Sequence, residues 1–354
     1  MPARVSFGIG IIPSEPPDEF IERVRLAEEL GFDSIWVADF RLYRDVYVSL
    51  ALAALSSTHL RLGVGITNPY TRHPALTAAG IASVDALSNG RALLGVGAGG
   101  VVLDLLQIKQ REPILACRRA VEMIRRYLSG NPVRGTGKPV TSASNVRLDF
   151  PTRPDLPIFI AATGLKMLTL AGEIGDGVII NVGAYPACID GALAAVGNGA
   201  WGVKRPRQSL EMLCWLQGCA VHEDAQVALD AVKPVAALTL AYAPAWMMEA
   251  MEIDDEVVKE IRRAFSAEGR EAAGQLVPNE LVEKFAVVGT PEQCIRKLKQ
   301  IRAKGFEEII VRLAQTNGGQ IEAMSTFAEQ VIKPMRADTT LATRAAVVER
   351  QSLN

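Results

Sequence analysis

The chain has 354 residues, of which 49% are hydrophobic and 22% charged, and its 38 basic residues nearly balance 39 acidic ones. This composition supports a large buried core and excludes a disordered chain, while a net charge of −1 argues against a nucleic-acid partner. No uncharged run is long enough for a membrane helix and the first residues show no signal-peptide pattern, so we expect a cytoplasmic protein with no membrane partner.

Short runs rich in Val, Ile and Leu alternate with amphipathic stretches, which is typical of parallel strands joined by helices. Four strands are predicted in the first hundred residues, at Val5–Ile12, Ser34–Ala38, Leu60–Ile66 and Ala92–Val96. The helices that follow the first three strands are predicted at Asp18–Leu30, Tyr47–Ser56 and Pro74–Leu87. Gly31 ends the first of these helices.

The same alternation continues in the rest of the chain. Helices are predicted at Pro113–Leu128, Gly164–Gly175 and Gln320–Ile332, with a hairpin or loop over Gly130–Asn145. Further strands are predicted at Pro157–Ala161, Gly177–Asn181, within Met212–Val221, and at Glu308–Leu313. Thr290 and Gln293 form a capping box around Pro291 and open a helix that ends at Gly305.

A chain of this length forms either two domains or one large α/β barrel. Eight predicted strands with a helix after the last favour a (β/α)8 TIM barrel over a doubly wound sheet of about five to seven strands. The segments Leu30–Ile35 and Lys304–Ile309 repeat one design, a helix end, a Gly, a Phe and a strand. We predict one barrel domain over 1–333 with insertions after strands four and seven, the second mostly helical over 222–290, and a polar tail over 334–354.

The cysteines and histidines of this sequence do not form a recognisable disulfide, metal-binding or catalytic motif. The five cysteines form no CxxC pair, so we expect reduced and mostly buried thiols at Cys117, Cys188, Cys214, Cys219 and Cys294. Three histidines occur without an HExxH motif or a neighbouring cysteine cluster. We therefore predict neither a metal site nor a histidine-based triad.

In a (β/α)8 barrel the active site lies at the carboxyl ends of the strands. The residues at these predicted ends are Pro13, Ser14, Asp39, Thr67, Asn68, Gly97–Gly99, Ala162–Gly164, Asn181, Ala220 and Arg312. They include no lysine for a Schiff base, no pair of carboxylates and no nucleophile beside a base. We therefore predict that a cofactor carries the reaction, the alternative being catalytic groups from loops outside this set.

Two glycine-containing segments are candidate ligand loops. Gly95–Gly100 matches GxGxxG, but it follows the fourth strand and runs into an apolar stretch without a clear helix cap. We interpret it as a barrel loop that lets a flat ring or a backbone approach closely. Thr163 and Gly164 precede a helix whose free N–H groups would bind phosphate, with Lys166 nearby, the alternative being an ordinary helix start capped by Thr163.

Four segments resemble a known family: Gly65–Pro74, Asp85–Ala92, Gly95–Gly99 and Lys166–Gly177. They are similar to the bacterial luciferase-like superfamily, and within it to the methylenetetrahydromethanopterin reductases that use the deazaflavin coenzyme F420. The resemblance extends from about Val5 to Leu313. It implies a barrel in which a deazaflavin or FMN ring lies across the strand ends, against a bulge after the third strand.

The resemblance also implies site residues. The bulge of relatives contains a non-proline cis peptide, which here would join Gly65 to Ile66. The implied cofactor-binding residues are Asp39, Gly65, Ile66, Thr67 and Asn68 along the ring, Gly97, Ala98 and Gly99 beside it, and Ala162, Thr163, Gly164 and Leu165 on the phosphate side. Asp39 and Asn68 are the predicted catalytic residues, which would position the ring or the substrate.

Three positions depart from the pattern of these reductases. Gly10 and Gly100 stand where relatives usually have acidic residues, and Phe40 stands where they usually have histidine. Hydride transfer depends on ring placement more than on a protein acid, so reduction is compatible with these losses, whereas a pterin substrate is less so. Phe40 and Val101–Leu103 indicate a less polar pocket, or they simply pack against the protein.

We predict an F420-dependent oxidoreductase that transfers a hydride between the deazaflavin and an organic small molecule. The alternatives are an FMN-dependent luciferase-like monooxygenase, a flavin-free folate reductase that uses a nicotinamide, and a non-catalytic flavin-binding barrel. Relatives pair through the helices that flank strands two to four, which predicts a homodimer through Ala51–Ala54 and Ala75–Ala82. Burial of these residues against their own barrel is the alternative.

Overall fold

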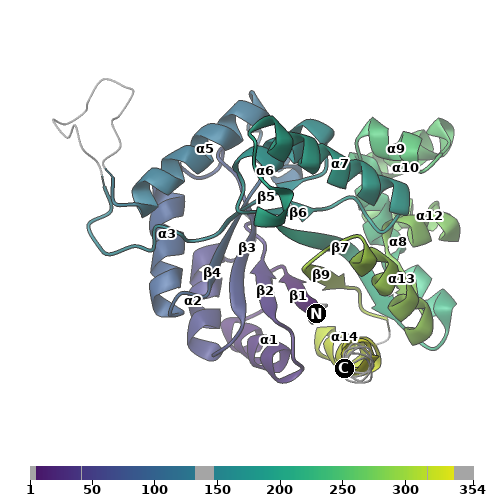
Figure 1. Cartoon of the computed structure of the whole chain (residues 1–354). Helices are drawn as coiled ribbons and strands as arrows, with labels where there is room; N and C mark the ends of the chain where they lie inside the picture. The colour runs from purple at the N-terminus through teal and green to yellow at the C-terminus, as the bar shows by residue number, and fades with distance from the viewer. Residues whose placement is uncertain (1–4, 41, 132–146, 317, 339–354) are drawn as a thin grey trace, which may run out of the picture.

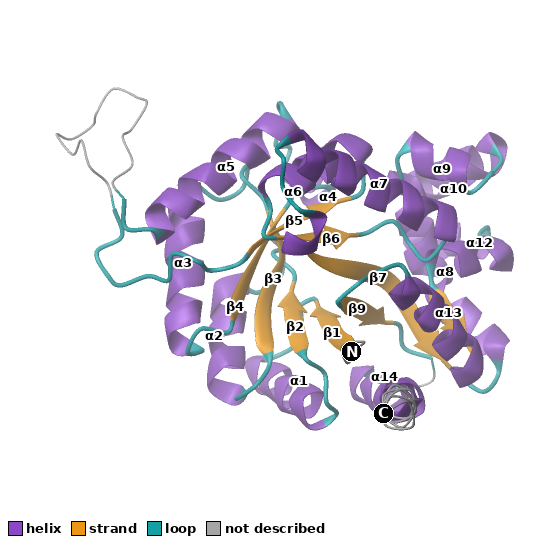
Figure 2. Cartoon of the chain, viewed as in Figure 1, coloured by secondary structure: helices purple, strands orange, loops and turns teal. Residues whose placement is uncertain are grey.

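Parallel strands close into a barrel that helices surround (Figures 1 and 2). The computed structural model describes residues 5–40, 42–131, 147–316 and 318–338. Eight strands form the barrel: β1 (Ser6–Ile11), β2 (Ser34–Val37), β3 (Arg61–Thr67), β4 (Ala92–Val96), β5 (Ile158–Ala162), β6 (Gly177–Ile180), β7 (Glu211–Val221) and β9 (Glu308–Leu313). Because β9 pairs with both β7 and β1, the ring is closed and the predicted (β/α)8 barrel is confirmed.

The helices of the first half are α1 (Pro17–Glu29), α2 (Val46–Ser56), α3 (Pro74–Leu87), α4 (Val101–Leu105), α5 (Pro113–Leu128), α6 (Leu165–Ile174) and α7 (Pro186–Gly202). Those of the second half are α8 (Ala225–Tyr242), α9 (Ala245–Ala250), α10 (Asp255–Glu268), α11 (Arg270–Gln275), α12 (Asn279–Phe285), α13 (Pro291–Ala303) and α14 (Gln320–Phe327). In Figure 1, α8, α9, α10 and α12 lie together on the β7 side of the barrel. The capping box of Thr290 and Gln293 is confirmed at the start of α13.

Some elements differ from the sequence-based prediction. The helix α7 between β6 and β7 is not among the predicted helices, nor is the short strand β8 (Val287–Gly289), which pairs only with β7. Residues 334–338, assigned to the polar tail, continue as helix, and Arg336 there pairs with Asp33. The rest of that tail and most of the predicted loop over Gly130–Asn145 lie outside the described residues.

Side chains fill the interior of the barrel. Large apolar residues from several strands form the inner cluster: Trp36, Leu93, Phe159, Ile179, Leu213, Trp215 and Ile310. At the amino ends of the strands, buried Glu308 accepts hydrogen bonds from Ser34 Oγ and Trp36 Nε1. Burial raises the pKa of Glu308, against the opposing charge of Arg61. In a barrel of this kind a ligand binds at the opposite end, at the carboxyl ends of the strands.

The five cysteines are all buried and unpaired. This confirms the expectation of free and buried thiols. Cys214 and Cys219 stand on β7, and the other three stand on α5, α7 and α13.

The helices α6 and α7 pack closely through glycines. A Cβ atom on Gly199 of α7 would lie 1.9 Å from the Thr169 carbonyl oxygen of α6, and one on Gly172 would lie 2.1 Å from the Val196 carbonyl oxygen. Only glycine at these two positions leaves room for the neighbouring backbone.

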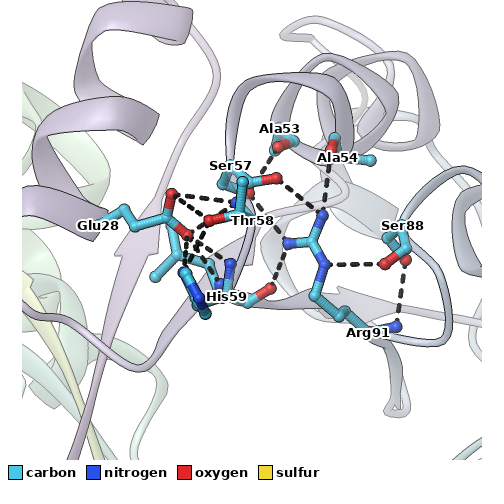
Figure 3. A network of polar contacts seen from close by, with 9 residues as sticks. Glu28, Ala53, Ala54, Ser57, Thr58, His59, Ser88 and Arg91 are labelled. Atoms are coloured by element: carbon cyan, nitrogen blue, oxygen red, sulfur yellow. Dashed lines mark hydrogen bonds and ion pairs between the residues drawn. The ribbon is translucent and has the colours of Figure 1, made fainter.

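A polar network ties α1 to the turn before β3 (Figure 3). The Glu28 carboxylate accepts the backbone N–H groups of Thr58, His59 and Leu60. On the other side of the turn, the Arg91 guanidinium donates to backbone carbonyls that include Leu60 O, at 2.7 Å. Burial acts to raise the pKa of Glu28, but the donated N–H groups outweigh it and lower that pKa below 4.5.

We expect Glu28→Gln to lower the free energy of unfolding by about 1–2 kcal/mol at neutral pH, because a charged acceptor of backbone N–H groups is lost. A lowered folded-state pKa means that Glu28 stabilises the fold above its ordinary pKa, and that this contribution disappears as pH falls through the folded-state pKa. Urea unfolding at about pH 7 and about pH 3 should therefore show the difference only at the higher pH. Exposed Glu29→Gln is the control, and an equal loss there would contradict the assignment.

Candidate functional site

The third strand carries an irregularity at its carboxyl end. Val64 pairs with Leu94 and Thr67 pairs with Val96, so β3 has one more residue than β4 in this interval, which forms a bulge at Gly65 and Ile66. The peptide bond between Gly65 and Ile66 is cis. The structure thus confirms both the bulge and the cis peptide that the family resemblance implied.

Asp39 and Asn68 lie beside this bulge and are both buried. Thr67 Oγ1 donates to Asp39 Oδ2 at 2.6 Å, which links the end of β2 to the end of β3. Asn68 Oδ1 accepts the backbone N–H groups of Tyr70 and Thr71, each at 3.0 Å. The Asn68 carbonyl group therefore shapes the following turn, a role that its predicted function did not include.

The glycine-rich loop after β4 lies against the bulge. A Cβ atom on Gly97 would lie 2.3 Å from Ile66 Cδ1, and Gln110 Nε2 donates to the Ala98 carbonyl at 2.6 Å. The apolar stretch after Gly100 forms the short helix α4, and no side chain caps its start, as expected. The loop still belongs to the fourth strand of a barrel, and its close contact with Ile66 fits the interpretation as a barrel loop.

The amino end of α6 is open. Gly164 is the N-cap residue, no side chain caps the helix, and a Cβ atom on Gly164 would have no neighbour within 4 Å. The alternative reading, a helix capped by the Thr163 side chain, is therefore not what the structure shows. The Thr163 carbonyl instead accepts Trp246 Nε1 of α9 at 3.1 Å, which holds this loop in place. Free N–H groups and the helix dipole here suit a phosphate.

Two of the remaining predicted residues, Asn181 and Ala220, line separate small hollows. Asn181 and Gln217 line one small hollow between the barrel and α8, and Ala220 lines another beside α14. Ser14 donates to Glu15. Phe40 packs against Tyr43, with ring centroids 5.5 Å apart, which matches the packing alternative for this side chain.

The side chains of Trp215 and Arg312 lie beside Gly10 of β1. A Cβ atom on Gly10 would lie 2.9 Å from Trp215 Cζ2 and 2.9 Å from Arg312 Cγ, so these residues occupy the space beside Gly10. Arg312 was among the predicted strand ends, but Trp215 was missed, because nothing in its own strand indicates which face points into the barrel.

Within the described part of the chain, no group of three or more His, Cys, Asp or Glu side chains is placed to hold a metal ion. Over the same residues, no helix combines the length and the apolar character that crossing a bilayer requires.

A closed (β/α)8 barrel with a bulged third strand, a cis peptide in the bulge and an open helix end across the mouth defines a luciferase-like barrel. The chain belongs to this family: a family model described as luciferase-like monooxygenase matches residues 4–308.

Comparison with known proteins adds detail. The chain is 32% identical to a 5,10-methylenetetrahydromethanopterin reductase of Methanolobus tindarius, over 86% of this chain and 93% of the relative. It is also 32% identical to the enzyme of that name from Archaeoglobus fulgidus, over 86% and 92%. The solved coenzyme F420-dependent tetrahydromethanopterin reductase from Methanopyrus kandleri superimposes with a TM-score of 0.83 at 29% identity, covering 94% of this chain and 100% of that one.

Proposed function

We propose that this protein is an F420-dependent oxidoreductase that transfers a hydride between the deazaflavin and a small organic substrate. One observation carries the proposal. The bulge at Gly65 and Ile66 and the open amino end of α6 share one barrel mouth, which offers a flat ring a platform and a phosphate a separate seat. The names of the relatives at 32% identity support the same activity.

The residues present fit a deazaflavin. The free space beside Gly164 leaves the first-turn N–H groups of α6 accessible, so they would hold the cofactor phosphate. Gly97 and Ile66 would support the ring, and Asp39 would fix its polar edge or the substrate. The cofactor supplies the hydride chemistry, and the chain supplies binding, orientation and exclusion of water.

FMN is the less favoured cofactor. The solved structures with FMN in their titles share 14% identity with this chain, which supports a common fold only. The relatives named as a methylenetetrahydromethanopterin reductase and as an F420-dependent tetrahydromethanopterin reductase share about twice that identity. Methylenetetrahydromethanopterin is therefore the first substrate to assay, although Gly10, Phe40 and Gly100 remove side chains that the reductases usually have.

Fluorescence titration of the purified protein with F420 and, in parallel, with FMN tests the cofactor. We expect saturable binding of F420 and at least about tenfold weaker binding of FMN. Tight binding of FMN alone would favour the monooxygenase, and binding of neither would favour the nicotinamide-dependent alternative. Binding of F420 without oxidation or reduction of any assayed substrate would favour the non-catalytic barrel.

Asp39→Asn should lower kcat by about 10–100-fold while F420 affinity and melting temperature change little, if Asp39 positions the reacting groups. Thr67→Val is the matched variant, because it removes the hydrogen bond to Asp39 and keeps the carboxylate. Steady-state kinetics with methylenetetrahydromethanopterin, the first substrate to assay, measure both. If Thr67→Val lowers kcat as much as Asp39→Asn does, Asp39 acts through the bulge and not on the reacting groups.

We also propose that the protein forms a homodimer through α2 and α3. Large apolar side chains of these helices stay exposed in the single chain, at Val48, Leu55, Leu76 and Leu87. A partner chain would cover these apolar side chains, and protein–protein contact is one role of exposed apolar surface. The free thiols suit a reducing compartment, and a cytoplasmic location stays a prediction.

A further inference from the structure

Arg312 stands near the carboxyl end of β9 and is partly buried. Its Nη1 donates to Gln217 Oε1 at 3.0 Å. Among the residues that the structure describes, no carboxylate forms an ion pair with it. Other half-buried arginines of this chain do have one: Arg61 pairs with Glu211, and Arg153 pairs with Asp85.

The surroundings of Arg312 raise the free energy of its charged form and so lower its pKa. Burial lowers the pKa of Arg312, the nearby positive charge of Arg270 in the β7–β8 segment lowers it further, and Tyr43 opposes both. A guanidinium that is partly removed from water beside another cation is costly unless an anion compensates it.

An irregularity in strand β7 places Gln217 opposite Arg312. Leu216 pairs with Val311 and Cys219 pairs with Leu313, so β7 carries one extra residue at Gln217 and Gly218, opposite Arg312. The resulting hydrogen bond orients one edge of the guanidinium and leaves its other N–H donors for a ligand.

A second donor lies beside Arg312. The indole Nε1 of Trp215 is buried and has no acceptor among the described residues. The Trp215 ring and the Arg312 stem both occupy the space next to Gly10, a position where the resemblance implies an acid. The mouth therefore carries a cation and a neutral donor where an acidic side chain is missing.

We propose that Arg312, with the indole N–H of Trp215, forms a subsite for an anionic group of the substrate, a carboxylate or a phosphate. This inference rests on the proposed function and adds the charge of the substrate to it. Planar guanidinium donors match the oxygens of both anions, which is why arginine recognises them. The substrate is thus an organic acid or a phosphate ester that presents its reacting carbon to the ring and its anion to β9.

The subsite is distinct from the proposed cofactor phosphate seat. That seat lies after β5, and β6 and β7 stand between β5 and β9 on the shorter way around the barrel. Only a ligand that spans the barrel mouth could contact both the amino end of α6 and Arg312. If the cofactor phosphate binds at α6, Arg312 remains available to bind the substrate.

Tryptophan fluorescence tests the subsite, because Trp215 lies beside Arg312. The full chain, with and without F420, is titrated with sodium phosphate and separately with sodium acetate at constant ionic strength. We expect a saturable response to at least one anion with a Kd of about 1–10 mM, and the anion that binds more tightly identifies the class. Trp215→Phe should remove the signal.

Arg312→Gln should weaken anion binding at least about tenfold and leave F420 affinity within about threefold. Arg312→Lys keeps the charge and should retain part of the binding, which separates loss of the subsite from loss of the fold. Exposed Arg296→Gln on α13 is the control and should behave as the wild type.

Three results would overturn the proposal: no saturable response to either anion, an unchanged response in Arg312→Gln, or a tenfold or greater loss of F420 affinity in that variant. The last result would assign Arg312 to the cofactor. If the wild type fails to bind F420, the proposed function fails, and the titration of the cofactor-free protein still decides the subsite.

Discussion

Gly164→Glu is expected to weaken F420 binding at least about 100-fold without lowering the melting temperature. The substitution places a carboxylate at the open amino end of α6, where the cofactor phosphate would lie. Two anions at one helix end repel each other, and the added side chain fills the space that the phosphate requires. Fluorescence titration with F420 measures the loss.

Folding should tolerate this change for two reasons. A Cβ atom on Gly164 meets nothing within 4 Å, and its φ of −85° suits any residue. An acidic residue at a helix start also interacts favourably with the helix dipole. Two variants serve as controls. Gly164→Ser adds a small N-cap side chain without a charge. Gly202→Glu adds the same charge at the carboxyl end of α7. Wild-type affinity in Gly164→Glu would refute the phosphate seat.

Gly199→Ala is expected to lower the free energy of unfolding by about 3 kcal/mol. This loss is larger than the one expected for Glu28→Gln. The added methyl group would lie 1.9 Å from the Thr169 carbonyl oxygen, which is part of the α6 backbone and cannot rotate away. The two helices must separate, and their contacts on both sides weaken. Urea unfolding followed by circular dichroism gives the value.

The same helix offers a matched control. Gly197 also lies inside α7, and a Cβ atom there would meet nothing within 4 Å. Gly197→Ala should therefore stabilise the protein by about 0.5–1 kcal/mol, since alanine favours a helix over glycine. Equal effects of the two substitutions would show that helix propensity, and not packing against α6, governs this element.

The barrel could be predicted because its strands are short runs rich in Val, Ile and Leu, which is typical of parallel strands buried on both faces. Helix α7 could not be predicted from the sequence, because its glycines interrupt the helical pattern. Gly199 is needed for close packing against α6, a tertiary requirement that local propensity does not contain. Strand β8, Val287–Gly289, is too short to show a period.

The candidate site was predicted in two different ways. The strand ends follow from the barrel itself, so Asp39, Thr67 and Gly164 could be named from the order of elements alone. The cis peptide between Gly65 and Ile66 came from the family resemblance, since no pattern of residue types encodes it. The meeting of Trp215 with Arg312 depends on the register of β7 against β9, which are far apart in the sequence.

The buried cysteines give the protein a built-in reporter of unfolding. Burial raises the pKa of Cys117, Cys214 and Cys294 to about 12, so almost no thiolate exists in the folded chain near neutral pH. Alkylating reagents attack thiolates, and they gain access here only when the barrel opens. The rate of alkylation of each cysteine therefore measures how often its own strand or helix is released, without any added label.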